Sequence, residues 1–95
     1  MYESEIKPFL QKISNKLSKK DKKLYLQILK KIEEIVNSYG VEHYKNLKHD
    51  LKEFKRVHIG HFVLVFKFDN SENKIYFEDF DYHDKIYMKK FWLFF

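Results

Sequence analysis

The sequence contains no cysteine, so neither disulfide bonds nor thiolate chemistry can contribute to its structure or activity. This absence suits a reducing compartment, and we expect the protein to be cytoplasmic. The N-terminus has acidic residues where a secretory signal would have basic ones, and no apolar run approaches the about 20 residues that a membrane helix requires. We therefore expect neither a signal peptide nor a membrane span.

Alanine and threonine are also absent, and the chain has one proline and two glycines. The sequence contains no linker, internal repeat or low-complexity segment. Of its 19 basic residues, only Arg56 is an arginine. Lysine is so abundant that its presence alone says little about function, whereas the single arginine is a candidate for a specific role.

The sequence does contain enough apolar residues for one core. Of the 95 residues, 44% are hydrophobic and 19% aromatic, which predicts a single domain over residues 1–95 without covalent cross-links. Charge is distributed unevenly, because residues 1–56 contain 14 basic and 8 acidic side chains, whereas residues 57–95 contain 5 and 6. The basic N-terminal part favours a polyanion or an acidic protein as a partner.

Residues 62–68 form an almost unbroken run of β-branched and aromatic residues, which is typical of a strand buried on both faces. We predict this run as the central strand of a sheet. Two further strands are predicted over residues 52–59 and 74–82, and the polar stretch 69–73 suits a hairpin loop.

The predicted strand 52–59 has two chemically different faces. One face would be apolar and formed by Phe54, Val57 and Ile59. The other would display the polar side chains Lys52, Arg56 and His58. Gly60 and His61 form a tight link to the next strand, which predicts His61 at the tip of a hairpin. The sequence therefore places acid, base and cation chemistry at one end of a sheet.

The N-terminal part predicts a short strand over residues 2–6 and then a helix. Pro8 suits the first turn of this helix, and apolar residues at helical spacing continue to about residue 17. The order of all elements predicts an α+β fold, in which a short first strand is followed by two helices packed on one face of an antiparallel sheet.

A longer second helix is predicted over residues 19–39. Ser18 and Asp21 resemble a capping box at its start, and Gly40 suits the position just after its end. Its polar side carries four lysines, namely Lys22, Lys23, Lys30 and Lys31. These lysines either lie along a nucleic-acid backbone or form a solvated face, and the solvated face is the commoner case.

With these elements in this order, the chain resembles the RelE/ParE superfamily of small bacterial and archaeal toxins. Residues 54–66 read as the basic strand, glycine turn and apolar strand of that family, and residues 83–87 as its closing histidine and aromatic residue. Only one family arginine is kept, as Arg56, and the others are replaced by His58, Val63 and Asp84. The chain is more similar to the YafQ-type branch, which uses histidines and aligns with Phe54, His58, Ile59, His83 and Tyr87.

This resemblance implies a RelE-like fold with a short C-terminal helix as an option, and a ribosome-dependent endoribonuclease that cuts mRNA without a cofactor. It also implies a cognate, RelB-like antitoxin that holds the toxin inactive in a hetero-oligomer. The aromatic tail, residues 86–95, would either cap the core or dock this antitoxin. A second interpretation stays open: a non-catalytic relative that binds only its antitoxin or another target such as gyrase.

Metal-free RNA cleavage requires a base for the ribose 2′-OH, an acid for the leaving 5′-oxygen and cations for the phosphoryl oxygens. Imidazoles suit the first two roles, and our first choices are His58 and His83. Arg56 would clamp the phosphate, and Tyr87 would stack on or orient a base. The other candidates are His61 for catalysis and Lys45, Lys48, Lys52 and Lys55 for binding RNA phosphates.

A mixed metal site is a lesser alternative. His58 and His61 could combine with Asp79, Asp81 and His83, but two histidines on either side of a tight turn need not point the same way. We therefore predict no metal site.

Overall fold

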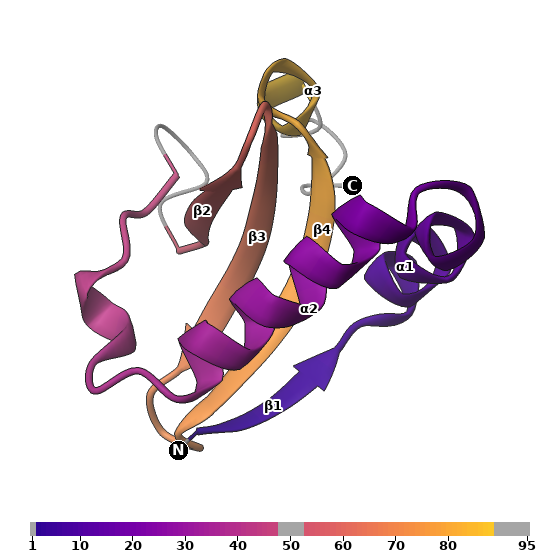
Figure 1. The fold of residues 1–95 in the computed structure, drawn as a ribbon. Coiled ribbons are helices and arrows are strands. Elements are labelled where there is room, and N and C mark those ends of the chain that lie inside the picture. The colour runs from indigo at the N-terminus through magenta and orange to yellow at the C-terminus, as the bar shows by residue number, and fades with distance from the viewer. Residues whose placement is uncertain (1, 48–52, 89–95) are drawn as a thin grey trace.

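The computed structural model describes residues 2–47 and 53–88. A sheet of four strands in the order β1-β4-β3-β2 forms its centre, and α2 crosses one face of this sheet with α1 beside it (Figure 1). The strands are β1 (Glu3–Ile6), β2 (Lys55–Ile59), β3 (Phe62–Asp69) and β4 (Lys74–Tyr82). The helices are α1 (Pro8–Lys20), α2 (Lys22–Val36), the 3-10 turn η1 (Val41–His43) and α3 (His83–Met88). The α+β fold is as predicted.

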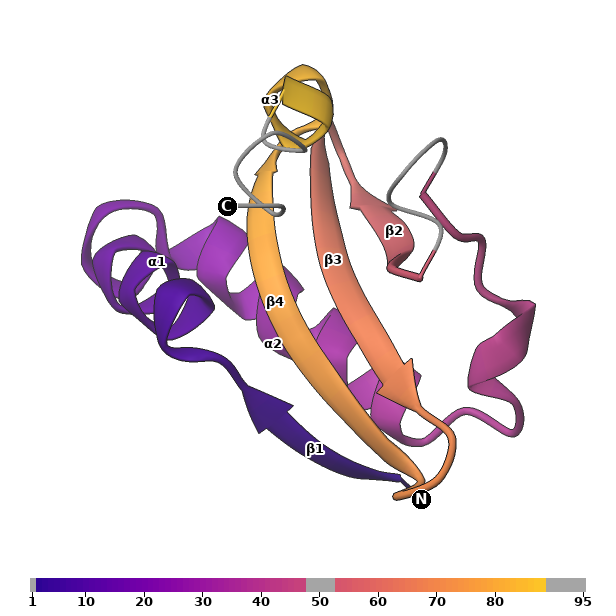
Figure 2. The same ribbon diagram turned by 180° about the vertical axis from the view of Figure 1, so that it is seen from behind.

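The prediction that residues 62–68 form a central strand is confirmed, because four consecutive residues of β3 are buried. Leu64 and Phe66 pack toward the helices, in a core with Ile28, Ile35 and Phe77. The alternate residues of β3 point to the other face of the sheet, which Figure 2 shows from behind. There a smaller group, the open-face cluster, consists of Leu47, Val63, Val65 and Ile86 with Phe54 and Tyr87 packed against it.

The strand predicted over residues 52–59 begins only at Lys55, since Glu53 and Phe54 form a turn and a bend. The prediction that Phe54 shares a face with Val57 and Ile59 was wrong. Val57 packs in the helix-side core, whereas Phe54 packs in the open-face cluster. The period of two along a strand places Phe54 on the side of Arg56 and His58.

The predicted boundary between the two helices was also wrong. Ser18 lies inside α1, where its hydroxyl donates to the carbonyl of Asn15 at 2.6 Å. Asp21 caps α2 instead, because its side chain accepts the Leu24 N–H at 3.2 Å. Likewise α2 ends at Val36, and Gly40 has an extended φ of −152° before η1 rather than the left-handed conformation of a helix-ending glycine.

Strand β1 joins the sheet parallel to β4, so the sheet is mixed at this edge. Tyr2, directly before β1, is tied to the chain at and after the end of α2, because its N–H donates to the carbonyl of Val36 and its hydroxyl accepts the N–H of Val41. None of the helices in the described part of the chain has the length and apolar character needed to cross a membrane.

The turn between β2 and β3 lies next to the end of β4. Gly60 has a φ of +60°, and His61 has no positive φ, which matches a type II′ hairpin turn. The N–H of His83, the first residue of α3, donates to the carbonyl of His61 at 3.2 Å. Figure 1 shows α3 over this end of the sheet. The fold therefore brings the ends of β2 and β4 together.

Candidate functional site

The imidazole rings of His58 and His83 stack against each other, with 5.7 Å between their centroids and 18° between their planes. His58 lies near the end of β2, and His83 begins α3 directly after β4. Both side chains are exposed. The structure therefore brings together the two histidines, here called the histidine pair, that the sequence predicts as acid and base.

Strand register explains why the two rings meet. His58 lies opposite Val63 on β3, which in turn lies opposite Asp81 on β4, two residues before His83. The histidine pair thus spans the width of three neighbouring strands at the end where α3 begins. Tyr87 lies one turn further along α3, with its ring centroid 5.1 Å from that of His83. Its half-buried ring packs against the open-face cluster, which fixes its place beside the pair.

Arg56 lies two residues before His58 on β2, so both side chains project from the same face of the sheet. The Nε of Arg56 is buried and has no hydrogen-bond partner within the described residues. Although the His58 side chain is exposed, partial loss of solvent around it lowers the pKa of His58 below its ordinary value of 6.5, and the positive charges of Arg56, His83 and Lys45 lower it further. His58 is therefore mainly neutral at pH 7 and can accept a proton.

His83 has an acidic neighbour in Asp84, whose Oδ1 lies 3.5 Å from its Nδ1. This contact is at the outer limit of a hydrogen bond, and the side chains are 47% and 98% exposed. Asp84 thus restrains the His83 ring only weakly.

Lys55, predicted to bind an RNA phosphate, makes hydrogen bonds within the chain. Its ammonium donates to the carbonyls of Glu42 and Tyr44 and to the side-chain oxygen of Asn46, at 3.4, 3.2 and 3.0 Å. These bonds fasten the segment that leads into the sheet. Because Lys55 alternates with Arg56 along β2, it also lies on the opposite face from the histidine pair.

The remaining predicted residues divide into three cases. Lys45 is exposed and close enough for its charge to lower the pKa of His58. His61 is exposed at the hairpin turn and contributes its backbone carbonyl to His83. Lys48 and Lys52 lie outside the described residues. Within residues 2–47 and 53–88, no three His, Asp or Glu side chains are placed to hold a metal ion, so the mixed site of His58, His61, His83 and two aspartates is not assembled there.

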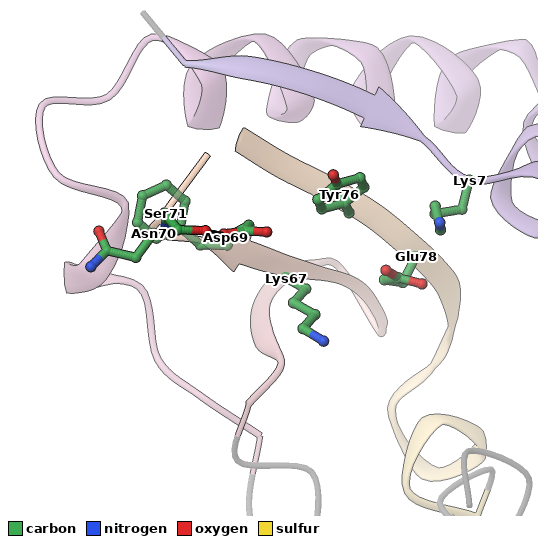
Figure 3. A pocket seen from close by; sticks show the side chains of 8 residues that line it. Lys7, Lys67, Asp69, Asn70, Ser71, Tyr76 and Glu78 are labelled. Atoms are coloured by element: carbon green, nitrogen blue, oxygen red, sulfur yellow. Dashed lines mark hydrogen bonds between the residues drawn. The ribbon is translucent and has the colours of Figure 1, made fainter. Parts of the chain in front are cut away.

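A depression lies on the sheet face that carries the open-face cluster, toward the loop between β3 and β4 (Figure 3). It has a volume of about 630 Å³ and is lined by Lys7, Lys67, Phe68, Asp69, Asn70, Ser71, Tyr76 and Glu78. Lys7 and Lys74 lie over the ring of Tyr76, and burial raises the pKa of Glu78. No predicted residue of the described chain lines this depression. Without an imidazole in its lining, it offers no pair like His58 and His83.

Two of three comparisons relate the chain to known proteins. No model of a known protein family matches it. The chain is 57% identical over 91 residues to a protein of Methanocaldococcus jannaschii described as "Putative toxin RelE4", covering 95% of each chain. It is 46% identical over 88 residues to an uncharacterized protein of Methanosarcina mazei, covering 92% of this chain and all of the other.

Among solved structures, the fold is similar to a chain of the toxin–antitoxin complex RelBE2 of Mycobacterium tuberculosis. The TM-score is 0.61 at 16% sequence identity, and the match covers 86% of this chain and 91% of the other. This structural likeness supports the arrangement of helices and strands described above.

Proposed function

The chain belongs to the RelE/ParE superfamily of toxins, and we propose that it is a ribosome-dependent endoribonuclease that cuts mRNA and thereby inhibits translation in the cytoplasm. The observation that carries this proposal is the histidine pair, with its 5.7 Å centroid separation, next to the only arginine of the sequence. Both rings are exposed, so a phosphodiester can reach them from solvent.

His58 acts as the base in this proposal, because its lowered pKa keeps it neutral near pH 7. It takes the proton of a ribose 2′-OH, and the 2′-oxygen attacks the adjacent phosphorus. The bond from phosphorus to the 5′-oxygen breaks, and protonated His83 gives its proton to that leaving oxygen. The products are a 2′,3′-cyclic phosphate and a free 5′-hydroxyl. The proton taken from the 2′-OH is balanced by the proton given to the 5′-oxygen, so no co-substrate is consumed.

The distance between the two rings suits a base and an acid that act on the same phosphodiester. Each proton transfer needs a heavy-atom distance of about 2.6–3.2 Å between ring nitrogen and oxygen. Rings whose centroids are 5.7 Å apart can therefore reach the attacking and the leaving oxygen of one phosphodiester. A pair on distant parts of the surface could not.

Arg56 supplies the positive charge that the phosphoryl oxygens need as the transition state forms. The Arg56 side chain is half-buried on the same face of the sheet as His58, and its positive charge acts on the His58 ring, so the charge lies next to the histidine pair. Tyr87, 5.1 Å from His83, is in position to stack on a base next to the scissile bond. Val63, which the family comparison sets against an arginine, is fully buried and contributes no charge.

We also propose an antitoxin partner, as in the RelBE2 toxin–antitoxin complex. The basic part of this chain, residues 1–56, favours an acidic segment of such a partner. Binding over the histidine pair would exclude RNA and keep the toxin inactive.

The test is expression of the wild type, His58→Ala and His83→Ala from a tightly controlled promoter, with mapping of 5′ ends in a translated mRNA. We expect growth arrest with new ends in phase with codons for the wild type alone. These ends should accept phosphate from polynucleotide kinase without prior phosphatase treatment, since cleavage leaves a 5′-hydroxyl. Growth arrest without cuts would indicate another target such as gyrase, and no arrest would leave a binding-only relative; both results contradict the proposal.

A further inference from the structure

A groove of about 250 Å³ lies between α2 and the outer edge of β2. We call it the edge groove, and it is lined by Gln27, Lys30, Lys31, Glu34, His58 and Ile59. His58 is thus shared between this groove and the histidine pair. Anything that occupies the groove is next to the base of the proposed reaction.

The wall that β2 gives to the groove is a free strand edge in the described chain. Near its start, β2 is covered on this edge, because the N–H of Arg56 donates to the carbonyl of Lys45 at 2.9 Å. Groups two residues apart on a strand point to the same side, so the N–H of His58 also points outward. No described residue accepts it. A backbone donor of His58 therefore lies on the β2 side of the groove, on the residue whose ring belongs to the histidine pair.

The other wall of the groove is basic. Lys31 is paired with Glu34, whose carboxylate lies 2.9 Å from its ammonium. Lys30 has no ion pair within the described residues and is exposed. Two lysines against one carboxylate leave the groove with a net positive charge, and the unpaired ammonium of Lys30 is its source.

We propose that the edge groove binds the phosphate next to the scissile one in a single strand of RNA, and that Lys30 is the positioning residue for it. An ammonium and a free backbone N–H on facing walls suit a phosphate oxygen. This inference rests on the proposed function, because it identifies where the RNA strand continues beyond the histidine pair. It also separates Lys30 from Lys22 and Lys23 of α2, which do not line the groove and for which a solvated face is the simpler interpretation.

The chain offers a matched control in Lys23. It lies seven residues before Lys30 on the same helix, hence on the same helical face and about 10 Å further along the axis. Lys23 is exposed like Lys30 but does not line the groove. Lys23→Gln and Lys30→Gln therefore make the same change in net charge, and only the second changes the groove.

Binding is measured by fluorescence anisotropy with a labelled single-stranded RNA hexamer whose 2′-hydroxyls are all methylated, so that it cannot be cleaved. We expect Lys30→Gln to raise Kd by roughly three- to tenfold and to reduce the slope of log Kd against log salt concentration by about 0.7. Lys23→Gln should change neither quantity appreciably. Glu34→Gln should tighten binding, because it removes the acid and frees Lys31. Thermal unfolding of each variant checks that the fold is kept.

Equal losses in the two lysine variants would show a general charge effect and overturn the inference, as would no loss in Lys30→Gln or no RNA binding by the wild type. If Lys30→Gln weakened capture of a coexpressed antitoxin but not of RNA, the groove would be an antitoxin site and the inference would also fail. Binding that depends on Lys30 in a protein that cuts no mRNA would support the groove and reject the nuclease. Cleavage of mRNA that does not depend on Lys30 would support the nuclease and reject the groove as its phosphate site.

Discussion

His58 and His83 stack with 5.7 Å between their ring centroids, although one lies near the end of β2 and the other begins α3. At this separation the protonated form of His83 opposes protonation of His58, and its charge is one cause of the lowered pKa of His58. A single proton shared between two rings is the state that provides an acid and a base together.

Removal of either ring should nearly abolish cleavage. We expect His58→Ala and His83→Ala each to lower the single-turnover rate on mRNA-programmed ribosomes by about 10²–10⁴-fold. The double variant should lose little more than the worse single one, because both groups act in the same step. Additive losses would contradict a paired mechanism.

His61→Ala is the control for these variants. The structure gives the His61 side chain no ring contact with the pair and uses only its backbone carbonyl, which alanine keeps. Its rate should stay close to that of the wild type. A loss as large as that of His58→Ala would mean that the sequence-based choice of His61 was correct.

The pH dependence of the rate should follow His58. A base must be deprotonated, so the rate rises as pH increases through the pKa of His58, and the midpoint of this acidic limb should lie below 6.5. Arg56→Gln removes a nearby positive charge, which raises that pKa and shifts the limb to higher pH. The ring proton signals of His58 in an NMR titration should move in the same direction. Lys67→Gln, a similar change at a residue that does not influence His58, should leave both midpoints in place.

Arg56 should show opposite effects on activity and stability. Arg56→Met keeps the aliphatic contacts and removes a buried donor that has no partner in the described chain, so the free energy of unfolding in urea should be unchanged or slightly higher. Cleavage should fall, and a lost hydrogen bond to a charged phosphate, about 1.5–3 kcal/mol, corresponds to roughly 10- to 150-fold. Arg56→Lys should recover only part of the rate, because lysine lacks the planar fork. Strong destabilisation by Arg56→Met would assign Arg56 to the fold instead.

The sequence predicts much of the sheet because its signals are local. The apolar run of β3 can be stable only when both faces are covered, and Gly60 supplies the positive φ that the adjacent turn needs. Strands joined by short turns are neighbours, so a histidine near the end of β2 and one just after β4 are expected within a few strand spacings of each other. The contact between these rings depended on the register and on the position of α3, which local patterns do not specify.

Other features are built from segments that are far apart in the sequence. The edge groove joins Lys30 of α2 to His58 of β2, and the depression in Figure 3 joins Lys7 to Lys67 and Glu78. The hydrophobic periodicity of the sequence gives no information about such long-range contacts. The hydrogen bonds of Lys55 were not predicted for the same reason, because their acceptors include carbonyl groups of a connection whose path the sequence does not reveal.

The junction between α1 and α2 contains two residues that could serve as the N-cap of α2, namely Ser18 and Asp21. Sequence spacing favoured Ser18 as the cap of the second helix, but Asp21 accepts the Leu24 N–H, and Ser18 bonds back to Asn15 within α1. Asp21→Ala should therefore lower the free energy of unfolding by about 1 kcal/mol, the usual effect of losing an N-cap. Ser18→Ala should stay within about 0.5 kcal/mol of the wild type, because alanine is the better helix former and no cap is lost. Urea unfolding of the two variants, monitored by circular dichroism, shows which of the two residues caps α2. The reverse order of effects would mean that α2 begins after Ser18 and that α1 ends before Lys20.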